Sequence, residues 1–226
     1  MSPAFIDRTD AGRRLADRLA RVVLPPPVVV LALPRGGVPI GAEVARRLGA
    51  PLDLLLVRKI GAPGQPELAV AAVVEGDGPE VVVDEETLAA SGADRRYVQD
   101  EVREQWREIE RRRVRYLSGR ARPSLQGATV VVVDDGIATG TTVRAALQAL
   151  RRRRPGRLLL AVPVAPADTV ARLRAEGDEL VCLATPEPFR AVGLHYRDFH
   201  QVGDDEVIAA LQAAAGGAAT SGSPRP

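Results

Sequence analysis

Short apolar runs alternate with amphipathic segments along most of the chain. Val28–Leu33 and Val130–Val133 are continuous apolar runs rich in β-branched residues, which is typical of strands buried on both faces. Shorter runs predict further strands at 52–57, 69–74, 81–83, 158–164 and 180–183. Amphipathic spacing predicts helices that begin near residues 9, 38, 93, 167 and 206, and a further helix that ends near residue 153. Strands that alternate with helices predict an α/β fold with a mostly parallel, twisted sheet flanked by helices.

The boundaries of these elements follow from residues that start or stop them. Thr9 and Asp10 are placed to cap the first helix, and three prolines from Pro25 end it. The segment 58–68 has two glycines and two prolines and is predicted to be a loop, and Gly76-Asp77-Gly78 predicts a hairpin turn. We expect a single domain over 1–214, with a core at about 28–183 and a disordered tail at 215–226.

Composition narrows the classes of partner. The 226 residues are 46% hydrophobic and 27% charged, as in a globular protein, and the formal net charge is +2. That balance argues against nucleic acid as a partner, and 3% aromatic residues are too few for a base-stacking platform. One cysteine excludes an internal disulfide, and no apolar run approaches the length of a membrane span. We therefore expect a soluble, cytoplasmic protein without a membrane partner.

The strongest chemical pattern follows the strand at Val130–Val133. Asp134 and Asp135 come directly after it, and a short Gly- and Thr-containing loop then runs into a helix. Backbone N–H groups and hydroxyls at a helix N-terminus suit a phosphate, whereas the two carboxylates suit ribose hydroxyls or Mg²⁺. The whole run therefore predicts a site for a phosphorylated sugar.

Other interpretations of the acid pair use fewer of these residues. Two aspartates at a strand end also occur in receiver domains and hydrolases, so Asp134 alone fits a Mg²⁺-dependent phosphatase. That interpretation gives no role to Arg35 or Lys59, the single lysine of the chain. A Walker A loop is excluded, because Gly140 is not followed by lysine.

The run 130–142 resembles the phosphoribosyl-pyrophosphate (PRPP) motif of type I phosphoribosyltransferases. Leu33–Gly37 is similar to the pyrophosphate loop of that family, and Arg58-Lys59 with the glycines after it resembles the basic start of a flexible lid, at about 58–84. The segment from Pro188 to Tyr196 resembles the C-terminal hood, at about 185–203. The closest likeness is to an uncharacterised group of predicted phosphoribosyltransferases that share the Leu-Pro-Arg-Gly-Gly segment.

The resemblance implies an activity and a set of site residues. The activity is Mg²⁺-dependent transfer of a phosphoribosyl group from PRPP to a nitrogenous base or related acceptor, with release of pyrophosphate. The residues implied in catalysis are Arg35, Arg58, Lys59, Asp134 and Asp135, and the two aspartates would reach Mg²⁺ through water. Those implied in binding PRPP are Arg35, Gly36, Gly37, Asp134, Asp135, Gly136, Ala138, Thr139, Gly140, Thr141 and Thr142. Ile137 and Phe189 would contact the base.

The resemblance also implies finer features and leaves alternatives open. It implies a cis peptide bond between Pro34 and Arg35. Where 6-oxopurine enzymes carry an aspartate, this chain has Ala138, which argues against hypoxanthine or guanine as the acceptor. A non-catalytic regulator that senses PRPP or a nucleotide is the alternative function on the same fold. A second copy of the chain, as a homodimer, is a candidate partner beside PRPP and a small base-like acceptor.

Overall fold

The computed structural model describes residues 4–176 and 179–219 and shows two compact units. The first, the parallel-sheet unit, takes its described residues from Met1–Leu54, Ala121–Gly140 and Arg154–Pro226. The second, the antiparallel-sheet unit, comprises Leu55–Arg120 and Thr141–Arg153. Within the described ranges, none of the helices has the length and apolar character needed to cross a lipid bilayer.

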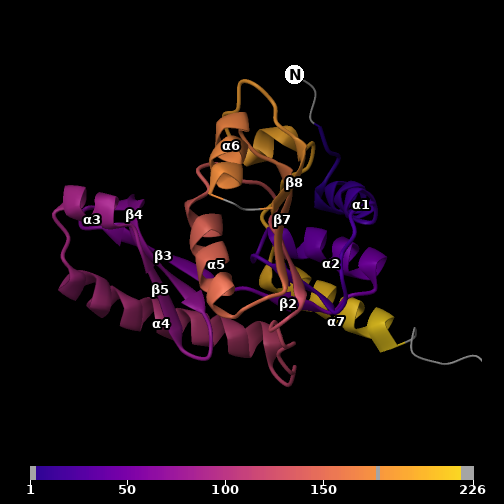
Figure 1. Ribbon diagram of the computed structural model, residues 1–226, viewed down its shortest axis with the longest axis horizontal. Coiled ribbons are helices and arrows are strands. Elements are labelled where there is room, and N and C mark those ends of the chain that lie inside the picture. Colours follow the sequence, from indigo (N-terminus) through magenta and orange to yellow (C-terminus); the bar gives the residue numbers. More distant parts are fainter. Residues whose placement is uncertain (1–3, 177–178, 220–226) are drawn as a thin grey trace, which may run out of the picture. The chain divides into compact units, whose positions relative to one another are not determined.

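The parallel-sheet unit is built on five strands in the order β2-β1-β6-β7-β8, and every neighbouring pair is parallel. Figure 1 labels β2, β7 and β8 of this sheet. Its strands are β1 (Val28–Ala32), β2 (Leu52–Leu54), β6 (Thr129–Val133), β7 (Arg157–Val164) and β8 (Glu179–Ala184). Its helices are α1 (Arg8–Leu19), α2 (Gly37–Leu48), α6 (Ala167–Ala175), the 3-10 helix η1 (Val192–His195) and α7 (Asp204–Ala219). All five residues of β6 are buried, so the strand lies in the middle of the core, as its apolar run predicts.

The strand order creates a switch point between β1 and β6. From β1 the chain crosses to β2 on one side and later returns to β6 on the other side of β1. The register pairs Ala32 with Val133, so the loops after the two strands leave the same edge of the sheet next to each other. In open parallel sheets, ligands bind in the crevice outside such a switch point.

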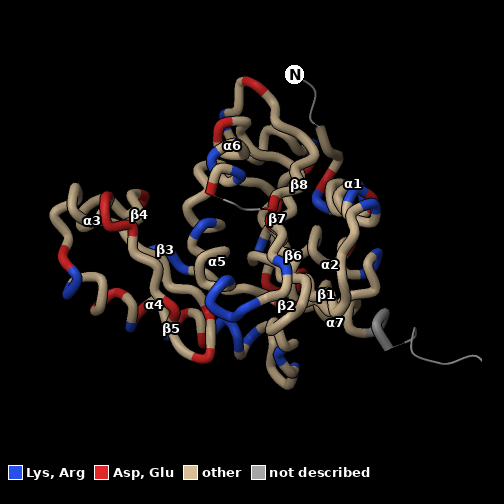
Figure 2. Tube along the Cα trace, in the orientation of Figure 1, with Lys and Arg blue, Asp and Glu red and all other residues tan. Residues whose placement is uncertain are grey.

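The antiparallel-sheet unit contains a meander of three strands, in the order β3-β4-β5. Its elements are β3 (Val57–Ala62), β4 (Gln65–Glu75), β5 (Pro79–Val83), α3 (Glu85–Ser91), α4 (Arg95–Leu117) and α5 (Thr141–Arg152). Figure 2 shows that acidic positions gather at the start of α3, whereas the last turn of α5 is basic. The predicted hairpin around Gly76-Asp77-Gly78 is confirmed.

Several boundaries differ from the sequence-based expectation. The predicted strand 52–57 is divided, because β2 ends at Leu54 and Val57 begins β3 in the other sheet. The predicted loop 58–68 is wrong: it forms most of β3 and the start of β4. The first helix is capped by Asp7, whose side chain accepts a hydrogen bond from the Asp10 N–H, rather than by Thr9 or Asp10.

The C-terminal and lid regions hold two further differences. The short helix α3 was not expected; its N-cap is Asp84, which accepts a hydrogen bond from the Thr87 N–H. The last helix continues to Ala219 and so includes the first residues of the predicted tail. Residues 220–226 of that tail lie outside the described residues.

Candidate functional site

The two loops at the switch point lie in direct contact. Gly36 and Gly37, from the loop after β1, pack against Asp134 and Asp135, which follow β6. A Cβ atom added to Gly36 would lie 2.0 Å from Asp135 Oδ2, and one added to Gly37 would lie 2.7 Å from the Val133 carbonyl oxygen. The φ of Gly36 is −60°, so it is the lack of a side chain, and not unusual backbone geometry, that the site requires here.

The peptide bond between Pro34 and Arg35 is cis, as the resemblance implied. The Arg35 side chain is 33% exposed, and its Nη1 lies 3.7 Å from Oδ1 of Asp204, the first residue of α7. The loop after β1 therefore carries a partly exposed guanidinium at the edge of the sheet where Asp134 and Asp135 lie.

The acid pair is electrostatically unusual. Burial raises the pKa of Asp134 well above its usual range, and the neighbouring Asp135 raises it further. Burial also raises the pKa of Asp135, although the guanidinium of Arg8 acts in the opposite direction. A nearby cation or hydrogen-bond donor favours the ionised form of a carboxyl group and so lowers a pKa that burial has raised. Carboxyl groups with a shifted pKa are common at functional sites.

The acid pair fits a divalent cation only as part of a ligand set. Carboxylate oxygens are ligands that Mg²⁺ accepts, and Mg²⁺ commonly combines one or two carboxylates with phosphate oxygens and water. Among the described residues, no group of three or more His, Cys, Asp or Glu side chains could hold a metal. Asp134 and Asp135 therefore fit a Mg²⁺ ion only together with ligands from outside these two side chains.

The loop between the acid pair and α5 is shaped by two glycines. Gly136 lies against the hood, since a Cβ there would come within 2.5 Å of Val192 Cγ1. Gly140 has a φ of +83°, a conformation that favours glycine, and Thr141 then starts α5. Ala138 and Thr139 between them are exposed, so this part of the loop is open to a ligand.

Ile137, predicted to contact the base, lies in the core of the parallel-sheet unit. Its side chain is 2% exposed, and its N–H donates to the Val164 carbonyl oxygen at 3.0 Å. It therefore supports the loop from inside the core. Thr169 adds a second support, because its hydroxyl donates to the Ala138 carbonyl oxygen at 3.1 Å.

The hood is fastened to the same loop. Tyr196 donates its hydroxyl hydrogen to the Asp135 carbonyl oxygen at 2.5 Å, and burial raises the pKa of that phenol. Phe189, the predicted base contact, is half-buried, and its ring lies 5.0 Å from that of His195. Burial lowers the pKa of His195.

In the antiparallel-sheet unit, Arg58 and Lys59 point to opposite faces of β3. Arg58 Nε donates to Gln105 Oε1 on α4 at 3.0 Å, and burial lowers the pKa of this guanidinium. Lys59 is exposed and pairs across the sheet with Ala72. Ala72 lines a cavity of about 270 Å³ together with Thr141 and Arg144 of α5.

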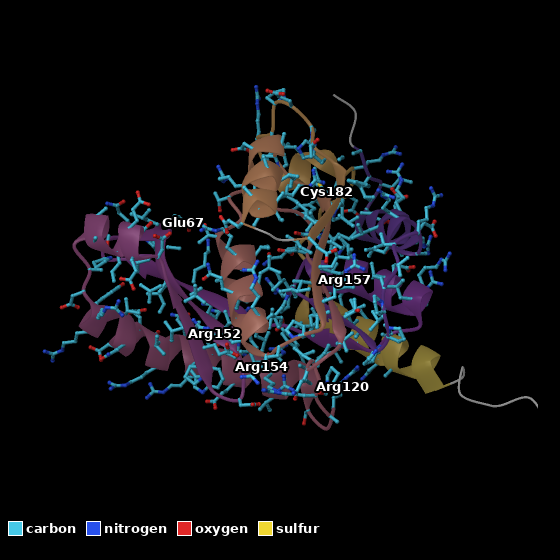
Figure 3. All side chains as sticks on the ribbon, viewed as in Figure 1. Glu67, Arg120, Arg152, Arg154, Arg157 and Cys182 are labelled. Atoms are coloured by element: carbon cyan, nitrogen blue, oxygen red, sulfur yellow. The ribbon has the colours of Figure 1, made fainter. Side chains whose placement is uncertain are left out.

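Figure 3 labels Glu67 and Cys182, two further residues that the sequence draws attention to. Glu67 is an exposed residue of β4, within the predicted lid. Cys182 lies on β8, where its thiol donates to the Ala184 carbonyl oxygen and burial raises its pKa. These contacts give Cys182 the character of a packed strand residue.

One contributor to the site was missed by the sequence analysis. Arg8, at the start of α1, forms an ion pair with Asp135 at 2.9 Å, and its side chain is 9% exposed. A signal for it exists in the sequence: once Asp7 is seen as the cap, Arg8 places a positive charge in the first turn of a helix, where the macrodipole disfavours it. Such a residue needs a partner elsewhere.

Comparison with known proteins identifies the class to which this fold and site belong. The family model described as "Phosphoribosyl transferase domain" matches residues 8–196, so the chain belongs to that family. The type I phosphoribosyltransferase fold expected from the sequence, with its parallel sheet and flanking helices, is confirmed.

Particular relatives agree with this assignment. The Mycobacterium tuberculosis protein named "Putative phosphoribosyl transferase Rv0571c" is 49% identical over 210 residues, which are 93% of this chain and 47% of that protein. The chain thus spans about half the length of the curated relatives it matches. The crystal structure of TT1426 from Thermus thermophilus is 46% identical, with a TM-score of 0.79 over 92% of this chain and 97% of that one. A hypothetical protein from Neisseria gonorrhoeae, solved with bound ppGpp, is 16% identical with a TM-score of 0.52, and shares the fold.

Proposed function

We propose that the chain transfers a phosphoribosyl group from PRPP to a nitrogenous base or related acceptor and releases pyrophosphate, in a Mg²⁺-dependent reaction. The observation that carries this proposal is the direct packing of the Gly36-Gly37 loop on the Asp134-Asp135 pair at the switch point of the sheet. It brings a place for a diphosphate next to two carboxylates suited to ribose hydroxyls. Since the family model spans residues of both units, we propose that they act as one domain over 1–214.

The loop residues have distinct roles in this proposal. Asp134 and Asp135 would accept hydrogen bonds from the ribose hydroxyls and would hold Mg²⁺ through water. Gly136, Ala138 and Gly140 shape the loop, and the hydroxyls and N–H groups of Thr139, Thr141 and Thr142 bind the 5-phosphate. Bound Mg²⁺ would supply positive charge to the diphosphate.

The proposed chemistry is electrostatic. As the bond between ribose C1 and the pyrophosphate oxygen breaks and the C1–N bond forms, negative charge grows on the leaving group. Arg35 and Lys59 stabilise that charge, and Gly36 and Gly37 let the backbone approach it. Arg58 is bonded to Gln105, so its role within the proposal is to hold β3 against α4. Phe189 packs on the base from the hood, while Ile137 supports the loop from below.

The acceptor is the open part of the proposal. Ala138 has no carboxylate with which to bind a purine N7 proton, so adenine or a base outside purine salvage fits better than hypoxanthine or guanine. The cytoplasmic location and the homodimer stay predictions.

A turnover assay tests the proposed function. The full chain is incubated with PRPP, Mg²⁺ and, one at a time, adenine, hypoxanthine, guanine, xanthine, uracil and orotate, and both pyrophosphate and nucleoside monophosphate are measured. We expect one acceptor to give equal amounts of both products, and chelation of Mg²⁺ to stop the reaction. If PRPP binds but none of the acceptors is converted, the result would contradict the proposed transferase activity and favour a regulator that senses PRPP.

A further inference from the structure

Arg8 uses its whole guanidinium to join the acid pair to the hood. Nε donates to Asp135 Oδ2 at 2.9 Å, and Nη2 lies 2.9 Å from the same oxygen. Nη1 donates to the His200 carbonyl oxygen at 2.8 Å. The guanidinium carbon also lies 3.9 Å from the centroid of the Phe199 ring, within range of a cation–π interaction. One side chain from the first helix thus contacts a residue 127 positions away and another 192 positions away.

Removing the charged Arg8 and Asp135 side chains from water costs free energy, which their mutual contacts must offset. Both partners are largely withdrawn from water, with 9% of the Arg8 side chain and 15% of the Asp135 side chain exposed. A buried ion pair gains little over apolar residues of similar size, so it is weak evidence for stability alone. What the pair does provide is geometry, since a planar guanidinium holds a carboxylate in one orientation.

The orientation of Asp135 is therefore fixed from two sides. Arg8 takes Oδ2, and Gly36 allows the carboxylate to lie against the backbone of the neighbouring loop. Both guanidinium contacts go to Oδ2, and neither involves Oδ1. Tyr196 fixes the Asp135 backbone through its carbonyl oxygen.

We propose that Arg8 is a positioning residue for the phosphoribosyl donor: it clamps one oxygen of Asp135 so that the other meets a ribose hydroxyl, and it links that carboxylate to the hood. This inference rests on the proposed function. It assigns a role in donor binding to the first helix, which lies outside every segment that the sequence analysis connected with the site.

The N-terminal segment has further contacts that do not depend on this guanidinium. The Phe5 N–H donates to the His195 carbonyl oxygen, and the Arg197 N–H donates to the Phe5 carbonyl oxygen. The rings of Phe5 and Tyr196 pack with their centroids 5.4 Å apart. Because these contacts involve none of the three side-chain nitrogens of Arg8, we expect a variant at that position to keep α1 in place, which makes the role of the guanidinium testable.

Calorimetric titration of PRPP with Mg²⁺ into three variants tests the proposal. Arg8→Met keeps the length of the side chain and removes the fork, and Arg8→Lys restores the charge without the fork. Arg13→Met is the matched control, because Arg13 is on the same helix, is 65% exposed and has a loose ion pair with Glu43 at 3.6 Å. We expect the Kd for PRPP to rise at least tenfold in Arg8→Met, to recover in part in Arg8→Lys, and to stay within twofold in Arg13→Met.

A double-mutant cycle separates positioning from a general structural role. If Arg8 acts through Asp135, then Arg8→Met in an Asp135→Asn background should change the PRPP affinity less than twofold. The proposal would be overturned if the losses of PRPP binding free energy from the two substitutions add, or if Arg8→Met binds PRPP with the wild-type Kd. If Arg8→Met does not fold, the cycle is run with Arg8→Lys, with the same two outcomes. A wild-type chain that does not bind PRPP would overturn the proposed function itself, and the role of Arg8 with it.

Discussion

Gly36→Ala is a small change that should disable the site. The backbone at Gly36 has φ −60° and ψ −35°, which alanine adopts freely, so the substitution causes no backbone strain. By itself the exchange would stabilise the chain by about 0.4–1 kcal/mol, because alanine reduces the entropy of the unfolded state. The added methyl carbon, however, would lie 2.0 Å from Asp135 Oδ2 and 2.5 Å from Asp135 Cγ. The steric clash therefore decides the sign.

The magnitude follows from what the Asp135 carboxylate loses when it moves. Overpacking costs about 1–3 kcal/mol. A carboxylate that swings away also leaves the largely buried Arg8 without its anionic partner, and breaking such a pair costs about 3–5 kcal/mol when the charge stays buried. Because the side chain can relieve part of the clash by rotating, we expect a net loss of about 3 kcal/mol. For a chain of this size, that loss lowers the Tm by about 6–12 °C.

The assay is thermal unfolding together with PRPP titration at a temperature where both chains are folded. Gly36→Ala should weaken PRPP binding at least tenfold, since the carboxylate no longer holds its place. Gly78→Ala is the matched control, because a Cβ at Gly78 would meet nothing within 4 Å, and its Tm should stay within about 1–2 °C of the wild type. A Gly36→Ala chain with unchanged Tm and unchanged PRPP affinity would refute this reasoning.

Three further predictions concern other parts of the chain. Lys59→Ala should lower kcat/KM about 100-fold, which corresponds to about 2.7 kcal/mol of transition-state stabilisation, with little change in Tm. Lys59→Arg should recover only part of this loss. If steady-state kinetics show a fully active Lys59→Ala variant, Lys59 does not belong to the site. Phe189→Ala should weaken nucleotide binding about 3–10-fold and PRPP binding less, as measured by calorimetry, and equal losses would argue against stacking on the base. Hydrogen bonds from Arg111 and Arg112 hold the pKa of Glu108 at about 2. Because this pKa lies below the unfolded value, Glu108→Gln should lower the Tm at neutral pH, and the difference should shrink as pH falls from about 5 towards 2; a difference that does not depend on pH would contradict the assigned pKa.

The sequence predicted the parallel sheet well because its signal is local. Strands buried on both faces must be apolar throughout, so Val28–Leu33 and Val130–Val133 could be recognised without their partners. The acid pair and the glycines after Arg35 were recognisable for a similar reason, since short loops with special chemistry keep their residues together in the chain.

The β3–β4 hairpin shows where local patterns mislead. Its four glycines and prolines predict a loop, yet Gly64, with φ +72°, simply turns the chain between Ala62 and Gln65. Gly61 lies against Pro66, where a Cβ would come within 2.5 Å of the proline Cα, and the pairing shifts register there. The residues that resemble loop punctuation are therefore the ones that let this hairpin form.

The contacts of Arg8 could not be predicted from spacing. No periodicity connects residue 8 with a carboxylate 127 positions later, and the pairing arises only because α1 and the loop after β6 meet in the folded unit. The same applies to Gly36: its sequence context suggested a close approach to a ligand, whereas in the structure its missing side chain first makes room for Asp135.

Calorimetric titration of PRPP with Mg²⁺ into the wild-type chain and into Asp134→Asn/Asp135→Asn is the most direct test of the central claim. The two substitutions keep the shape of the side chains and remove both charges, so the far-ultraviolet circular dichroism of the two chains should be the same. We predict binding at one site in the wild type and none in the double variant. An unchanged PRPP affinity in a folded double variant would contradict the assignment of the donor site to this acid pair.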